Sequence, residues 1–280
     1  MEKQISDNIY LYQFNDNNYI AGQSYGNLIL KRNFDINIIN VIYEKHWDYL
    51  KTNNSPIIIK LLKKKILNWL DLIKEKDYLI QFEKGLAKSL NVSVDKIIEL
   101  QILGELSGIF CTIYTDNKKN IFYRILDTNI SNRELLQQIY PELHILNING
   151  NITFGNPIYL VNHTFISENF SFATFGNNLL DKKTYLQNTL PFYYKLKIYL
   201  DSANDEYDLI EKFNKDNEIY YDVEIIIKGK YESFHIDVMD ESKNKKGLII
   251  ERSDYSPLED KCPLDNLDNL HTLLPDFNRI

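Results

Sequence analysis

Three residues near the middle of the chain have side chains that can act together in covalent chemistry. Cys111 supplies a thiol, and Arg124 and Asp127 follow on a second apolar stretch after a short polar turn. A cation and a carboxylate beside a thiol can lower the thiol pKa and hold an amine next to it. Arg124 and Asp127 are three residues apart, so a regular strand places them on opposite faces unless a bulge intervenes. The alternative is that Cys111 is a small buried hydrophobic residue, the commoner role of a cysteine in an apolar strand.

The sequence lacks the motifs of several common enzyme classes. Neither GxGxxG nor GxxxxGK followed by Ser or Thr occurs among the ten glycines, so no phosphate-binding glycine loop is predicted. The five histidines have neither HxxxH nor HExxH spacing, and the distant Cys111 and Cys262 offer no pair of metal ligands. The GxSxG turn of the α/β-hydrolases is also missing. We therefore expect no cofactor and no metal site.

Several segments resemble one enzyme family. Cys111-Thr112, followed by a turn and Arg124-Ile125-Leu126-Asp127, resembles the Cys-Thr and Arg-Asn-x-Asp hairpin of cysteine-type N-terminal nucleophile (Ntn) hydrolases. These include acid ceramidase, N-acylethanolamine amidases, bile-salt and penicillin amidases, and the autoproteolytic penicillin acyltransferase group. Residues 21–26 are similar to the Gly-Tyr-x-x-Gly element of the acyltransferase-like members, residues 82–93 to the helix-turn-helix before the nucleophile, and residues 247–252 to a late strand.

The resemblance implies an amidase or acyltransferase that first cleaves its own backbone between Phe110 and Cys111. Cleavage would free the Cys111 α-amino group, whose reference pKa of about 7.7 to 8.0 suits a general base at neutral pH. The thiolate would attack the amide of a small N-acyl substrate, and the acyl-enzyme would pass its acyl group to water or to another amine.

The resemblance also assigns roles to the other site residues. Asp127 would hold the free amine, and Arg124 would contact the substrate or the nucleophile. Donors near Asn177 and at the Asp276 position would line an oxyanion site.

The sequence departs from the family pattern at several positions. Asp276 stands where the family has Asn, and an ionised carboxylate accepts hydrogen bonds rather than donating them. Ile125 replaces the Asn after the Arg, Phe110 replaces a small residue, and the chain ends at Ile280, where relatives continue with an Arg-bearing segment. These departures leave a second hypothesis open, in which the chain is a catalytically inactive relative that serves as a binding or interaction module.

The apolar patterns predict an α+β fold, with helices first and strands afterwards. The resemblance implies a four-layer αββα sandwich in one domain, in which residues 1–110 form a helical pro-segment and residues 111–280 a β-rich chain. Helices are expected from about residue 29 to about residue 50, and over residues 55–74, 77–90, 94–103, 190–203 and 205–213. Strands are expected over residues 9–14, 109–115, 121–127, 143–148, 157–161, 170–175, 223–227, 234–239 and 248–251.

Residues 55–74 form the clearest amphipathic pattern. One face carries Ile59, Leu62, Ile66, Trp69, Leu70 and Ile73, and much of the other carries Lys60, Lys63, Lys64 and Lys65. A basic amphipathic helix can bind a membrane surface or a calmodulin-like partner. It can also be a core-facing helix with a solvated back, which is the reading we favour.

Composition and charge limit the classes of partner and the cellular compartments that we expect for the protein. The chain has 32 basic and 39 acidic residues, and this net charge of -7 argues against nucleic acid as a partner. The N-terminus has no apolar stretch after a basic head, and no apolar run approaches the roughly 20 residues of a membrane span. Two distant cysteines favour a reducing compartment. We expect a cytoplasmic protein without stable membrane insertion, and we draw no expectation about its oligomeric state.

Overall fold

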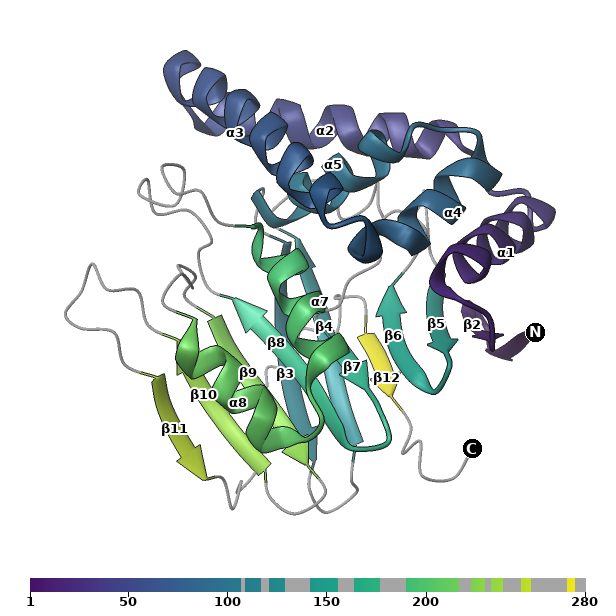
Figure 1. The fold of residues 1–280 in the computed structure, drawn as a ribbon. Coiled ribbons are helices and arrows are strands. Elements are labelled where there is room, and N and C mark those ends of the chain that lie inside the picture. The colour runs from purple at the N-terminus through teal and green to yellow at the C-terminus, as the bar shows by residue number, and fades with distance from the viewer. Residues whose placement is uncertain are drawn as a thin grey trace.

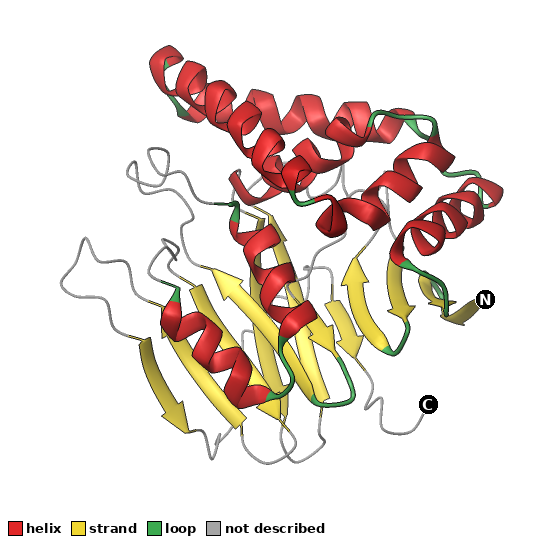
Figure 2. Cartoon of the chain, in the orientation of Figure 1, coloured by secondary structure: helices red, strands yellow, loops and turns green. Residues whose placement is uncertain are grey.

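The fold is taken from a computed structural model of the chain. The structure describes residues 1–106, 109–116, 121–128, 142–155, 164–176, 190–216, 223–229, 233–238, 248–252 and 271–274. It mixes helices and sheets, which confirms the predicted α+β class, and the helices gather at one end and on one face of the strands (Figures 1 and 2).

The N-terminal third of the chain is mainly helical, and serines cap two of its helices. The helices are α1 (Asn18–Lys31), α2 (Asn37–Asn53), α3 (Pro56–Glu75), the 3-10 helix η1 (Asp77–Ile80), α4 (Gln81–Leu90) and α5 (Val94–Leu106). The side chain of Ser55 caps α3, which has Pro at its start, and the Ser93 hydroxyl accepts a hydrogen bond from the Lys96 amide.

The continuous helix expected from about residue 29 to about residue 50 is wrong, because the chain breaks between α1 and α2. Arg32 ends α1, and Asn33 adopts a left-handed conformation with φ of 60°. A left-handed residue cannot continue a right-handed helix, and Asn tolerates this conformation better than most residues do. The break places Arg32 at the end of a helix, where its side chain can reach the sheet.

Helix α3 confirms the core-facing reading, with one exception. Leu62, Ile66 and Trp69 are buried, while Lys60, Lys63 and Lys64 are exposed. Lys65 is buried, contrary to the expected solvated face, and its ammonium lies 5.2 Å from the centre of the Trp69 ring. A lysine can bury its aliphatic stem while its charge contacts an aromatic face.

Among the described residues, nine strands form one sheet in the order β1-β2-β5-β6-β7-β8-β9-β10-β11. Strand β2 (Ile9–Phe14) pairs with β5 (Leu143–Ile148) in parallel, and the other neighbours are antiparallel. The remaining strands are β1 (Glu2–Ser6), β6 (Asn151–Gly155), β7 (Thr164–Ile166), β8 (Phe170–Gly176), β9 (Val223–Gly229), β10 (Ser233–Val238) and β11 (Leu248–Arg252).

A smaller sheet has the order β12-β4-β3, with β3 (Ile109–Asp116), β4 (Ile121–Thr128) and β12 (His271–Leu274). Strand β3 contacts β8 of the large sheet. Helices α7 (Phe192–Ser202) and α8 (Glu206–Lys215) lie on one side of the large sheet and β3 and β4 on the other (Figure 1). The described residues thus stack a helical layer and two sheets, with the N-terminal helices across one end.

Glycines allow two of the helices to touch through their backbones. Helices α1 and α4 cross where Gly22 meets Phe82 and Gly85 meets Tyr19. A Cβ on Gly22 would lie 2.1 Å from the Phe82 carbonyl oxygen, and one on Gly85 would lie 2.0 Å from the Tyr19 carbonyl oxygen. Residues 21–26 and 82–93 therefore pack directly against each other.

Most predicted elements correspond to observed ones, with shifts of a few residues at their ends. Asp205 caps α8, because its carboxylate accepts a hydrogen bond from the Asp208 amide at 2.8 Å. Strands β1, β6, β7 and β12 were not predicted. The strand expected over residues 157–161 lies outside the described residues.

Candidate functional site

The predicted nucleophile lies on the hairpin of the small sheet. Strands β3 and β4 pair in one uninterrupted antiparallel register, which confirms the hairpin that the sequence predicted. Cys111 lies opposite Leu126, Ile113 opposite Arg124, and Phe110 opposite Asp127. The ladder thus runs through the bond between Phe110 and Cys111.

This register settles which hairpin positions share a face. Directly opposed residues of an antiparallel ladder lie on the same face, and residues two apart on one strand do so as well. The positions of Cys111 and Arg124 therefore share one face, whereas that of Asp127 belongs to the other face, next to the Phe110 to Cys111 bond. The described ladder contains no bulge that would bring all three together, and the side chains of these residues lie outside the described part of the structure.

The two predicted oxyanion residues follow strands that lie near this hairpin. Asn177 comes directly after β8, the strand of the large sheet that contacts β3. Asp276 comes after β12, which pairs with β4 from His271 opposite Ile125 to Leu274 opposite Phe122. Strand β12 therefore runs away from the Asp127 end of β4. Asn177 and Asp276 themselves lie outside the described residues.

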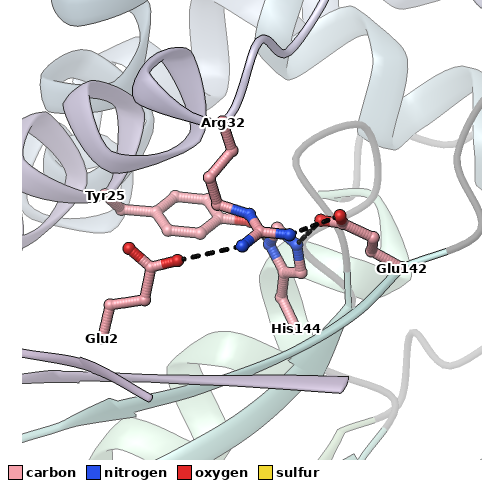
Figure 3. Close-up of polar contacts among 5 residues, drawn as sticks. All are labelled: Glu2, Tyr25, Arg32, Glu142 and His144. Carbon is pink, nitrogen blue, oxygen red and sulfur yellow. Dashed lines mark hydrogen bonds and ion pairs between the residues drawn. The ribbon is translucent and has the colours of Figure 1, made fainter. Parts of the chain in front are cut away.

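A second polar cluster, which the sequence did not reveal, is buried under α1 (Figure 3). The Tyr25 hydroxyl lies 2.6 Å from Nδ1 of His144, and Nε2 of the same ring lies 3.0 Å from a Glu142 carboxylate oxygen. Tyr25 and His144 have no exposed surface, and Glu142 is half-buried. We call Glu2, Tyr25, Arg32, Glu142 and His144 the helix-sheet network.

The contacts of His144 define its protonation. Burial lowers its pKa and outweighs the opposite effect of Glu142, so the ring is neutral at pH 7. An ionised carboxylate can only accept, so Nε2 carries the proton and donates it to Glu142. Nδ1 is then the acceptor, and the Tyr25 hydroxyl donates to it.

Arg32 closes the network at the surface. Its guanidinium donates to Glu142 at 2.5 Å and to Glu2 at 3.3 Å, and it stacks over the Tyr10 ring with its carbon 3.5 Å from the ring centre. The pKa of Glu142 is held below its usual value, mainly by the hydrogen bond from His144 and also by the hydrogen bond and positive charge of Arg32.

The helix-sheet network can hold a proton, but its histidine faces no solvent. Glu2 belongs to β1, Tyr25 to α1 and His144 to β5, while Arg32 is the C-terminal cap of α1 and Glu142 directly precedes β5. The network therefore fixes α1 on the parallel pair of strands β2 and β5. We assign it a structural role. No local spacing in the sequence could have found it, because its members are brought together only by the pairing of distant strands.

No group of three or more His, Cys, Asp or Glu residues suited to a metal ion occurs within the described ranges. No helix in that part of the chain is long and apolar enough to cross a membrane. The sequence matches no protein-family model and no curated protein.

Proposed function

We propose that the chain is an autoproteolytic cysteine amidase or acyltransferase of the Ntn-hydrolase type, with Cys111 as its nucleophile. Its substrate would be a small N-acyl compound, and its complete fold a four-layer αββα sandwich. The register of the β3 to β4 hairpin carries this proposal, because it assigns Cys111 and Arg124 to one face and sets Asp127 opposite Phe110. A hydrolase site of this kind needs a cation position beside the thiol and an acid near the new amine.

Self-cleavage would be a hydrolysis of the Phe110 to Cys111 amide. One water is consumed, Phe110 gains a carboxylate, and Cys111 gains a free α-amino group. That amine would then take the thiol proton as the sulfur attacks the substrate carbonyl. The leaving amine departs with a proton, and water or another amine takes the acyl group from sulfur.

The position of Asp127 suits the new amine better than it suits the sulfur. Asp127 pairs with Phe110, the residue immediately before the amine that cleavage would release. A carboxylate at that position would hold the amine by hydrogen bonding. Arg124 lies two residues before Leu126, the residue that pairs with Cys111. Its guanidinium would contact the thiolate or the substrate carbonyl.

A denaturing gel with N-terminal sequencing tests the cleavage. The purified wild-type chain is expected to give one piece of residues 1–110 and another of residues 111–280 that begins with Cys111. Cys111→Ala should stay whole. Cys262→Ala is the matched control, since it removes the other cysteine and should be cleaved like the wild type. Under native conditions the pieces should stay together, because β2 of the first pairs with β5 of the second.

A second assay tests turnover. Aminomethylcoumarin amides of short and long acyl chains report release of the amine by fluorescence, and only the cleaved chain should hydrolyse them. A wild-type chain that stays intact under every condition would overturn the proposal, because no free α-amine would exist at the nucleophile. The non-catalytic alternative predicts that intact chain.

A further inference from the structure

The helix-bearing face of the large sheet is covered by two separate groups of helices. Helices α1 and α4 share a buried cluster with Tyr12 of β2 and Leu146 of β5. Helices α7 and α8 share another with Phe172 of β8 and Ile225 of β9. The strands between them, β6 and β7, lie under the junction of the two groups.

A cavity of about 350 Å³ lies at this junction. This volume is at the lower end of the range of small-molecule sites, which starts at about 300 Å³. Its buried wall is mostly apolar, apart from Glu83, and its rim is polar. The wall includes Phe82, Leu146, Phe165, Tyr193 and Leu200, and the exposed rim includes Asn18, Asn149, Asn151 and Asp201.

A buried carboxylate lines the same cavity. Glu83 is 1% exposed, and one of its oxygens lies 3.5 Å from the Lys197 ammonium. Lys197 also donates to the Leu79 carbonyl. Among the described residues, no hydrogen-bond donor reaches the second oxygen of Glu83. This second oxygen is therefore available to accept a hydrogen bond from an N–H group of a ligand in the cavity.

The charged residues that line the cavity favour a positively charged ligand. Among the described lining residues, Glu83 and Asp201 contribute two carboxylates, and Lys197, whose ammonium is already bonded to Glu83 and Leu79, contributes one cation. An anion would meet two like charges, whereas an ammonium would complement them. The aromatic wall fits an apolar body attached to that ammonium.

We propose that this cavity binds a small amphiphilic amine, with its ammonium on Glu83 and Asp201 and its apolar part among Phe82, Phe165 and Tyr193. Its lining includes residues of α4 and α7, and the β3 to β4 hairpin lies on the other side of the large sheet from α7 (Figure 1), so the cavity is distinct from the proposed nucleophile site. Binding there does not depend on self-cleavage.

Calorimetric titration of the full chain with three related probes tests the proposal. 2-Phenylethylamine carries the ammonium, 2-phenylethanol is its neutral counterpart, and phenylacetate is the anion. We expect the amine to bind, the alcohol to bind more weakly and phenylacetate to give no heat of binding at millimolar concentration. Cys111→Ala should bind the amine as the wild type does, which separates this result from the outcome of the cleavage gel.

Variants locate the site. Glu83→Gln should weaken amine binding about tenfold through loss of a charge-assisted hydrogen bond. Asp201→Asn changes an exposed rim residue, so it should fold normally and weaken binding by a smaller factor. Glu211→Gln, an exposed carboxylate on α8 outside the cavity, is the control and should leave the Kd unchanged. The proposal is overturned if phenylacetate binds as well as the amine, if no probe binds, or if both cavity variants bind the amine like the wild type.

Discussion

The hydroxyl of Tyr25 donates a hydrogen bond of 2.6 Å to Nδ1 of His144, across 119 positions of sequence. The bond joins the middle of α1 to the second residue of β5, and both side chains are fully buried. The hydrogen bond therefore helps to fix the distance of α1 from the sheet and the orientation of α1 about its own axis.

Tyr25→Phe should destabilise the protein by about 1 to 2 kcal/mol, because it removes the donor to a buried acceptor. Urea unfolding measures the change. Tyr12→Phe is the matched control, since Tyr12 is also fully buried and its hydroxyl has no hydrogen-bond partner among the described residues. Its removal should be neutral or stabilising. Equal losses in the two variants would contradict the assigned role of the hydrogen bond.

The crossing of α1 and α4 predicts that Gly22 tolerates no side chain. Gly22→Ala should cost about 2 kcal/mol or more despite the better helix propensity of Ala, since the added carbon would meet the carbonyl group of Phe82. Gly26→Ala is the comparison, because its added carbon meets mainly the Ser89 hydroxyl, which can rotate away. Thermal unfolding should rank Gly22→Ala well below Gly26→Ala.

Adding Ser89→Ala sharpens this test. The second change should recover most of the stability lost in Gly26→Ala, because it removes the atom nearest to the new carbon. It should not rescue Gly22→Ala, whose obstacle is backbone. Rescue of both variants would place the strain elsewhere.

The buried His46 predicts a pH dependence of stability. Burial lowers the pKa of this histidine from 6.5 to about 4. The unfolded chain thus binds a proton on His46 at a higher pH than the folded chain does. Stability should fall as the pH drops from about 6.5 toward 4, by roughly 3 kcal/mol from this residue.

The measurement is the free energy of unfolding at pH 7.5 and at pH 4.5, for the wild type and for His46→Gln. The variant does not titrate at this position, so its stability should fall less over the same interval. His144, whose pKa burial also lowers, is present in both proteins and cancels in the comparison. Parallel pH profiles would show that His46 is not the titrating group.

Glu105 connects α5 to the start of α7. Its two carboxylate oxygens accept hydrogen bonds from the Phe192 and Tyr193 amides at 2.9 and 3.0 Å, at a helix N-terminus without a side-chain cap from its own Pro191. Glu105→Gln should cost about 1 to 2 kcal/mol, because an amide presents one acceptor and no charge to the helix dipole. Glu211→Gln, in an exposed ion pair with Lys215, should change stability by less than about 0.5 kcal/mol in the same unfolding assay.

The elements that the sequence predicted well are those with local signals. Helix α3 has its periodic apolar face and its Ser-Pro start, and the β3 to β4 hairpin has two apolar runs around a polar turn. The break after Arg32 was missed because a single left-handed Asn interrupts an otherwise helical composition. Strand β12 is four residues long and offers too short a pattern to predict.

The features of the candidate sites also divide into those with a local sequence signal and those without one. The hairpin could be predicted from the sequence, and spacing alone gives the opposite faces of Arg124 and Asp127 in a regular strand. The helix-sheet network and the cavity could not, because each joins residues from distant segments. Glu83 is, in the sequence, one more acid of an amphipathic helix, and only the tertiary fold buries it beside Lys197 of α7.

The parallel pairing of β2 with β5 has a consequence for synthesis on the ribosome. Strand β2 ends at Phe14, yet its partner begins only at Leu143, after all the N-terminal helices and the hairpin. Until β5 has been synthesised, the edge of β2 that pairs with β5 stays unpaired. An unpaired strand edge is a template for pairing with another chain. A chain that stops before residue 143 keeps that edge, so the first half of this protein should aggregate when it is produced alone.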